Sequence, residues 1–345
     1  MASTRLELYN FTLTFGESRV LIDMLREVVF PAFFEFRRRD IKSSIYFFDK
    51  VELVHLRNTQ SEDGAPTTPV IGIAGQFIKD TELRREQVYN YERRELEMDR
   101  DSLRSSPSAI FLLILNNHRL LYLREGSFSP NIKSFEATIK AFLQDSHIAY
   151  LRSLYEEVSN RQISFREIES QNPYPDLRIS PLSNRASLRD FIHQYSKLET
   201  VEIKLTTTNA LDDGPFFDEI RRRKTAIRSS DTTIRHHNKE TGLDKEEAIA
   251  ETEELVEQAN TELKFSGLDH EQNKLTGNLE RLKLVIPLEI AADSIEDLAA
   301  RMHEKYDELI QRGAIAQARI IDTAGNIRQS LIELLSEARD DDDDS

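Results

Sequence analysis

Cysteine and tryptophan are absent from the 345 residues, and glycine and proline are scarce, at 11 and 10 residues. Without cysteine the chain has no disulfide, no thiolate zinc site, no iron–sulfur cluster and no cysteine nucleophile. No run of 18 apolar residues occurs, so we expect no membrane-spanning helix and no membrane partner. The first residues also lack the apolar core of a secretory signal. Together these absences predict a soluble, cytoplasmic protein.

Several common catalytic motifs are missing as well. The sequence contains no G-x-x-x-x-G-K-[ST], G-x-G-x-x-G, G-x-S-x-G or H-E-x-x-H pattern. Their absence disfavours the usual hydrolases, kinases and dehydrogenases. We therefore expect no cofactor and no metal, and the sequence favours a non-enzymatic protein.

Charge is distributed unevenly along the chain. The whole chain has 46 basic and 61 acidic residues, a net charge of −15. Residues 1–160 carry 21 basic against 23 acidic side chains, whereas residues 161–345 carry 25 against 38. The net charge argues against a protein that coats nucleic acid with its whole surface, but a local basic surface remains compatible with it.

The first half of the sequence is typical of a domain that mixes strands and helices. The continuous apolar run of residues 110–115 predicts a strand covered on both faces. Asn116-Asn117 then favours a tight turn into a second strand, so we predict a hairpin over 109–124. Periodicity predicts further strands over 6–15, 44–56 and 70–78, and helices from 17 to Pro31 and over 134–158.

The composition changes in residues 166–185, where Pro173, Pro175 and Pro181 disfavour regular structure. We predict a proline-rich linker there, between an N-terminal domain (1–165) and a C-terminal domain (186–338), with an acidic tail at 339–345. The predicted class is α+β, in which each domain is a mixed or antiparallel sheet with packed helices, and a long helix closes the second domain.

The second domain is predicted to hold strands over 201–208, 262–267 and 279–290 and helices over 216–229, 244–259 and 295–312. A last helix, about 314–338, places apolar residues at alternating spacings of four and three, which is a short heptad seam. The seam favours either packing on the chain's own sheet or contact with a second copy or a partner protein. Its residues are Ile320, Ala324, Ile327, Leu331 and Leu334.

One basic segment stands out within the acidic second half. Between residues 221 and 239 seven cationic side chains face one acid, a net of +6 over nineteen residues. Arginine and lysine, with neighbouring serine, threonine and asparagine, are the side chains that hold phosphate oxygens. The segment therefore predicts a nucleic-acid contact through Arg221, Arg222, Arg223, Lys224, Arg228, Arg235 and Lys239.

Two other interpretations of this segment stay open. Residues 240–262 follow at once with nine acids and one lysine, so a basic and an acidic helix could pair within the chain. An acidic partner protein is the other possibility. Two further clusters are predicted to be local charge arrangements: Arg37-Arg38-Arg39 with Lys42 at a helix C-terminus or as a second phosphate contact, and Arg84-Arg85 with Arg93-Arg94 on a solvated helix face with internal ion pairs.

Glu202 and Lys204 are the weak catalytic candidates. The spacing Glu-x-Lys on a strand resembles half of a metal-dependent nuclease site, in which carboxylates hold Mg²⁺ and the lysine positions a water. Such a site needs a further upstream acid, and Asp190 lies in a segment with a helical pattern.

The sequence therefore favours a non-enzymatic nucleic-acid-associated protein of a prokaryotic system. Phage defence is one setting for it; this setting is a general expectation for unfamiliar soluble prokaryotic chains and depends on no residue. The alternatives are a protein–protein assembly subunit that uses the C-terminal helix, as a homodimer or with a partner, and a metal-dependent nuclease. The sequence does not distinguish DNA from RNA.

Overall fold

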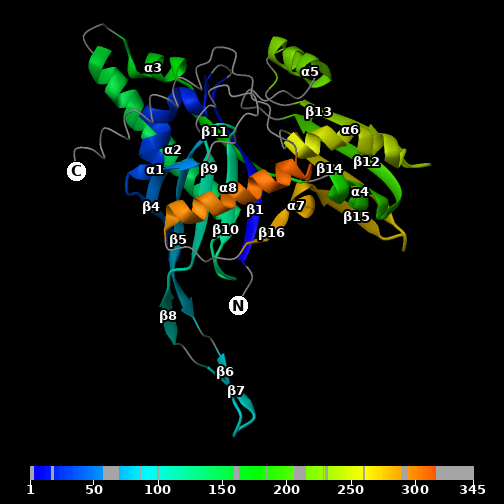
Figure 1. Ribbon diagram of the computed structural model, residues 1–345, viewed down its shortest axis with the longest axis horizontal. Coiled ribbons are helices and arrows are strands. Elements are labelled where there is room, and N and C mark those ends of the chain that lie inside the picture. Colours follow the sequence, from blue (N-terminus) through cyan, green and yellow to red (C-terminus); the bar gives the residue numbers. More distant parts are fainter. Residues whose placement is uncertain are drawn as a thin grey trace.

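The computed structural model describes residues 4–16, 19–56, 70–84, 87–98, 101–158, 163–183, 185–205, 215–227, 229, 232–258, 261–288 and 294–315. The predicted C-terminal seam (320–334) and the predicted acidic tail (339–345) lie outside these ranges. The described residues confirm the α+β class, and every strand pairing among them is antiparallel (Figure 1). No helix in these ranges is both long enough and apolar enough to cross a bilayer.

The larger sheet has the strand order β11-β1-β10-β9-β5-β4-β3. The predicted hairpin of residues 109–124 is confirmed at its centre, where Leu121 pairs with Leu112. Three short strands pair with members of this order: β2 (Arg19–Val20) and β16 (Val285–Leu288) with β1, and β8 (Ser102–Ser105) with β5. The seven strands in this order are β1 (Thr4–Phe15), β3 (Arg38–Ile41), β4 (Ser44–Leu56), β5 (Val70–Arg84), β9 (Ser108–Ile114), β10 (Arg119–Arg124) and β11 (Pro175–Pro181).

Helices cover both faces of this sheet (Figure 1). One face packs against α2 (Ile132–Val158), beside which lies α3 (Phe165–Gln171), and against the short helices η1 (Leu21–Met24), η2 (Leu25–Val29) and α1 (Phe30–Phe34). The other face packs against α8 (Ile295–Gln311) through Leu298, Met302 and Tyr306. Strand β9 is buried throughout its apolar run because it lies between these two layers.

The helical pattern predicted from residue 17 to Pro31 appears as a 3₁₀ turn and a π turn. The sequence predicts that Pro31 ends a helix, and this is wrong: Pro31 lies in the first turn of α1. Proline is tolerated there because the first N–H groups of a helix have no partner within the helix.

The smaller sheet has the order β13-β12-β14-β15, formed by Thr232–His237, Tyr195–Leu205, Thr261–Asp269 and Lys274–Asn278. Helices α4 (Arg185–His193), α6 (Lys245–Gln258) and α7 (Leu279–Leu282) pack on one of its faces. The core between them contains Ile192, Val201 and Phe265, all nearly fully buried. Helix α5 (Pro215–Ala226) lies in the connection from β12 to β13.

The smaller sheet is inserted between two strands of the larger one. The chain leaves the larger sheet after β11 and returns at β16, and both of these strands pair with β1. The two connections lie side by side, since Ser183 forms a bridge with Lys283 and the N–H of Leu284 donates to the carbonyl of Leu182 at 2.9 Å. Residues 285–311, which the sequence places with the second sheet, therefore belong to the first.

The segment predicted to be a proline-rich linker also contains regular structure. Helix α3 lies within it, and β11 follows as an edge strand of the larger sheet. Pro175 and Pro181 occupy the two ends of β11. Proline cannot donate to a strand ladder, so it is accepted at the ends of an edge strand.

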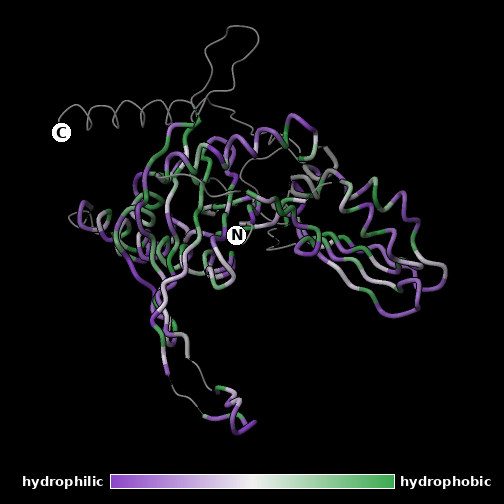
Figure 2. Tube along the Cα trace, turned by 60° about the horizontal axis from the view of Figure 1, so that its bottom comes forward, coloured by the Kyte–Doolittle hydropathy of each residue, from purple (hydrophilic) through white to green (hydrophobic). Residues whose placement is uncertain are grey.

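A β-arm extends from the larger sheet into solvent (Figures 1 and 2). Its base is the continuation of β5 paired with β8, and its tip is the two-stranded ribbon of β6 (Gln87–Asn90) and β7 (Glu95–Met98). The sequence predicts a solvated helix in this region, and that prediction is wrong. The ion pair expected of a helix does form between Arg93 and Glu97, at 3.4 Å, but across the ribbon's turn.

Candidate nucleic-acid interface

The smaller sheet has one face without a helix in the described part of the chain, and polar side chains cover it. We call this surface the open face. Strand alternation places its residues there, because neighbouring side chains such as Val201 and Ile203 point into the core on the other face. The open face includes Thr233, Arg235, His237, Thr200, Glu202, Lys204, Glu262, Lys264, Ser266, Lys274, Thr276 and Asn278, with the apolar Leu268 beside Lys274.

The strand register arranges these side chains in rows across the sheet. The central row runs from Arg235 through Glu202 and Lys264 to Asn278, so charges of opposite sign alternate along it. Arg235 Nε lies 3.3 Å from a carboxylate oxygen of Glu202. Cross-strand neighbours of opposite charge stabilise a sheet modestly, which explains how a face without apolar cover is maintained.

A hydroxyl-rich row lies beside the central one. Thr200 contacts His237 through an Oγ1–Nδ1 hydrogen bond of 2.8 Å, and on its other side it pairs with Ser266 in register. Ser266 in turn pairs with Thr276. Hydroxyl groups of this kind both donate and accept hydrogen bonds, and they are common ligands of phosphate oxygens.

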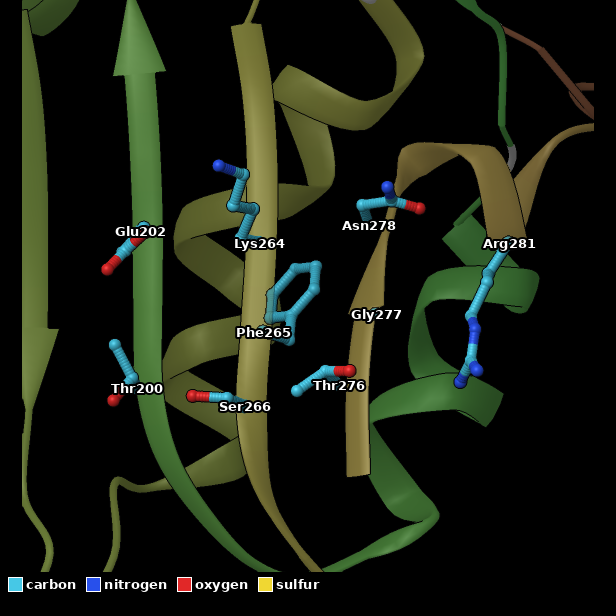
Figure 3. A pocket seen from close by; sticks show the side chains of 9 residues that line it. All are labelled: Thr200, Glu202, Lys264, Phe265, Ser266, Thr276, Gly277, Asn278 and Arg281. Atoms are coloured by element: carbon cyan, nitrogen blue, oxygen red, sulfur yellow. The ribbon is translucent and has the colours of Figure 1, made fainter. Parts of the chain in front are cut away.

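A pocket of about 350 Å³ opens on this face, lined by residues of β12, β14, β15 and α7 (Figure 3). Figure 3 shows Arg281 of α7 at the border of the pocket, beyond β15. With Arg281 included, the surface carries five cations against two carboxylates, whereas the chain as a whole has a net charge of −15. The cations are Lys204, Arg235, Lys264, Lys274 and Arg281, and the carboxylates are Glu202 and Glu262.

The basic segment of residues 221–239 is divided between α5 and β13. Arg222 and Arg223 lie on α5, both about three-quarters exposed, and both bind Glu219 one turn earlier, at 2.7 and 2.8 Å. Their hydrogen bonds, with Arg223 contributing most, hold the pKa of Glu219 below its usual value. Lys224 lies on the same helix, Arg235 on the open face, and Lys239 is exposed after β13. Arg228 and the Arg221 side chain lie outside the described residues.

Arg222, Arg223 and Arg235 do not form the predicted ion pairs with an acidic helix. Their ion pairs go to Glu219 of their own helix and to Glu202 of the neighbouring strand. The acidic helix α6 instead binds Arg189 of α4, which contacts Glu246 at 2.9 Å and Glu253 at 3.2 Å. Within the basic segment, His236 contacts α6, through Glu251 at 3.1 Å.

The nuclease candidates Glu202 and Lys204 do share one face, as their spacing predicts. Asp190, however, lies on α4, which packs against the opposite face of the sheet. Glu202 is occupied by Arg235 instead. No group of three histidine, aspartate or glutamate side chains that could hold a metal ion occurs among the described residues.

The cluster of Arg37, Arg38 and Arg39 with Lys42 does not end a helix, since α1 stops at Phe34 and β3 begins at Arg38. Arg37 binds Glu35 at 2.6 Å, and Arg39 donates to Thr138 at 3.5 Å. The cluster lies on the edge strand at the far end of the larger sheet from β11, so it is not part of the open face.

Sequence reasoning missed Lys264, Arg281 and the whole of β15. The alternation in Glu262-Leu263-Lys264-Phe265-Ser266 could have placed the first of these, because it mirrors Val201-Glu202-Ile203-Lys204. Strand β15 is only five residues long and contains Gly277, whose added Cβ would meet the Phe191 ring. Its short, glycine-containing pattern gives a weak strand signal.

Comparison with known proteins adds no family to this description. No protein-family model matches the chain, and a search of curated proteins finds no match. The functional proposal therefore depends on the geometry of the open face and of the basic segment.

Proposed function

We propose that this chain is a non-enzymatic nucleic-acid-associated protein that binds the phosphate backbone with the open face of its smaller sheet and with α5. The observation that supports the proposal best is the excess of cations on a helix-free polar sheet face in an acidic chain. Long-range attraction of a polyanion to the whole molecule would be weak, so contact has to be made locally. The prokaryotic, phage-defence setting stays a prediction on which no structural feature bears.

The arrangement favours backbone contact over recognition of bases. The open face presents lysines, arginines, hydroxyls and one histidine, His237, and its described residues include no exposed phenylalanine, tyrosine or tryptophan on which bases could stack. Such contacts position a nucleic acid without reading its sequence. We therefore expect binding with little sequence preference and with a strong dependence on salt.

The test is fluorescence anisotropy with labelled single-stranded DNA, duplex DNA and RNA over a salt series. The variant Lys204→Glu/Lys264→Glu/Arg281→Glu reverses three open-face cations. Each phosphate contact contributes about 0.7 to 0.9 to the slope of log affinity against log salt, so the slope should fall by about 2 to 3. Affinity at low salt should fall at least about tenfold, since each lost contact reduces counterion release.

The matched control reverses three exposed cations on α2 and α3, in Lys133→Glu/Arg152→Glu/Arg166→Glu. This control changes the net charge equally and should leave most of the affinity intact. If the wild type binds none of the three nucleic acids at low salt, the function is wrong. If the control loses as much affinity as the open-face variant, the placement of the site is wrong.

A further inference from the structure

The tip ribbon of the β-arm, residues 87–98, is an amphipathic element with one apolar face in solvent. Its register pairs Tyr89 with Leu96 and Gln87 with Met98, so these four side chains share a face. Tyr91 in the turn extends this face, because its ring contacts the Tyr89 ring edge-on at 5.1 Å. The exposed fractions are 85% for Tyr91, 70% for Met98 and 63% for Leu96, so this face is not covered in the described structure.

The opposite face of the ribbon is polar and internally bonded. Val88 pairs with Glu97 and Asn90 with Glu95. Asn90 donates to Glu97 at 2.7 Å, and Arg93 approaches the same carboxylate at 3.4 Å. The two faces therefore differ: one forms its own hydrogen bonds and carries one exposed apolar side chain, Val88, whereas the other exposes Tyr89, Leu96 and Met98 together.

This ribbon needs a second layer. A two-stranded hairpin alone is marginally stable in water, and an apolar patch that protrudes from a soluble protein marks an interaction surface. None of the tip residues belongs to any of the three hydrophobic cores of the described chain. Figures 1 and 2 both show the tip far from the rest of the molecule.

Charge indicates what the second layer is. Two copies of a chain with a net charge of −15 repel each other over most of their surface. The arm is the exception, because residues 79–106 carry seven cations and eight anions. Each arm has a net charge of only −1, so two arms can meet with little repulsion.

We propose that the tip ribbon is a self-association element, in which two copies of this chain pack their Tyr89/Tyr91/Leu96/Met98 faces against each other about a two-fold axis. Face-to-face packing of two ribbons gives a four-stranded, two-layer unit with the tyrosines and Leu96 inside it. The contact is small beside the roughly 1,600 Å² of a standard interface, so the dimer is concentration-dependent.

Light scattering coupled to size exclusion tests the proposal on the full chain. The wild type should move from 40.0 kDa towards twice that mass as its concentration rises. Tyr89→Ser/Leu96→Ser should remain at 40.0 kDa, whereas Val88→Ser on the opposite face should behave as the wild type. A wild type that stays monomeric at every concentration overturns the proposal, and so does a double variant that still dimerises. Far-UV circular dichroism checks that each variant is folded.

The absence of native cysteine allows a second measurement. Single variants Tyr89→Cys, Leu96→Cys and Met98→Cys place a thiol on the apolar face, and Asn90→Cys and Glu95→Cys place one on the polar face. Under mild oxidation any disulfide must join two copies, because each chain then has one thiol. Apolar-face variants should form covalent dimers and polar-face variants should not. Equal crosslinking from both faces contradicts the two-fold packing.

Discussion

The two sheets of this protein differ in how their faces are covered. Helices cover the larger sheet on both faces, with the α2 layer on one side and α8 on the other, and its central strands are almost entirely apolar. In the described part of the chain, helices cover one face of the smaller sheet, and its other face carries paired charges and hydroxyls. The contrast separates a sheet that is packed on both faces from a sheet with one polar face, which is the surface that we propose binds nucleic acid.

The contrast also shows what each sheet tolerates. In the larger sheet both side-chain sets are fixed by packing, so a change on either face alters the core. In the smaller sheet only the inward set is so constrained. The open face can therefore collect cations without a large loss of stability, as a surface that binds phosphates requires.

The largest expected effect concerns the core of the larger sheet. The Phe135 ring of α2 is fully buried and lies 5.3 Å from Phe111, 5.4 Å from Phe77 and 5.5 Å from Tyr122, between ring centroids. Phe135→Ala should lower the free energy of unfolding by about 3 to 5 kcal/mol. The open-face variant Lys264→Ala should change it by less than about 0.5 kcal/mol. Urea denaturation measures both, and similar losses would contradict the division between the sheets.

A smaller effect comes from a buried histidine in the larger sheet. His118 in the β9–β10 turn is fully buried, and its ring nitrogens have no hydrogen-bond partner in the described structure. Burial, with a smaller contribution from Arg119, lowers its pKa to about 4. Below about pH 6.5 the unfolded chain binds a proton here that the folded chain does not. The free energy of unfolding should therefore decrease as the pH is lowered from about 6.5 to about 4.

The variant His118→Asn isolates this contribution. Asparagine suits the backbone here, because φ is +53°. Between pH 7 and pH 4.5 the wild type should lose about 2 to 3 kcal/mol more stability than the variant, since each unit of pKa shift corresponds to about 1.4 kcal/mol. The measurement is urea unfolding at the two pH values. Parallel losses in both proteins would show that His118 does not titrate as its burial indicates.

The smallest expected effect tests whether α5 contributes to nucleic-acid binding. Glu219 holds Arg222 and Arg223, so Glu219→Gln should release both guanidinium groups towards a ligand. Nucleic-acid affinity at low salt should rise about two- to fivefold, with a steeper salt dependence, because one negative charge is removed beside two phosphate-binding groups. Stability should change by less than about 0.5 kcal/mol, as is usual for exposed ion pairs. Unchanged or weaker affinity in the anisotropy assay would remove α5 from the interface.

Local sequence patterns predicted the elements that local forces determine. The apolar run of 110–115 with Asn116-Asn117 identified the β9–β10 hairpin, and the periodicity of 134–158 identified α2. Glu202 and Lys204 were correctly placed on one strand face. The neighbours of Glu202 could not be predicted, because Arg235 and Lys264 lie beside it only through the register of two other strands.

The β-arm shows why charge spacing alone is ambiguous. Interleaved arginines and glutamates suggested a helix face with internal ion pairs, but the turn of a two-stranded ribbon brings Arg93 and Glu97 together as well. The discriminating signal was Val88, Tyr89 and Tyr91, since β-branched and aromatic residues favour strands. Likewise, the prolines near 175 suggested a linker, because only the tertiary fold shows that β11 is an edge strand.

The position of the inserted sheet also affects the order of folding during synthesis. Thr4 of β1 hydrogen-bonds to Leu288 of β16, 284 residues later in the chain. The first part of one edge of β1, residues 4–7, can be paired only after the entire smaller sheet has been translated. The inserted unit, whose contacts are closer in sequence, is therefore expected to fold before the sheet that encloses it is complete. Until then residues 4–7 of β1 have an unpaired edge, and unpaired strand edges favour aggregation.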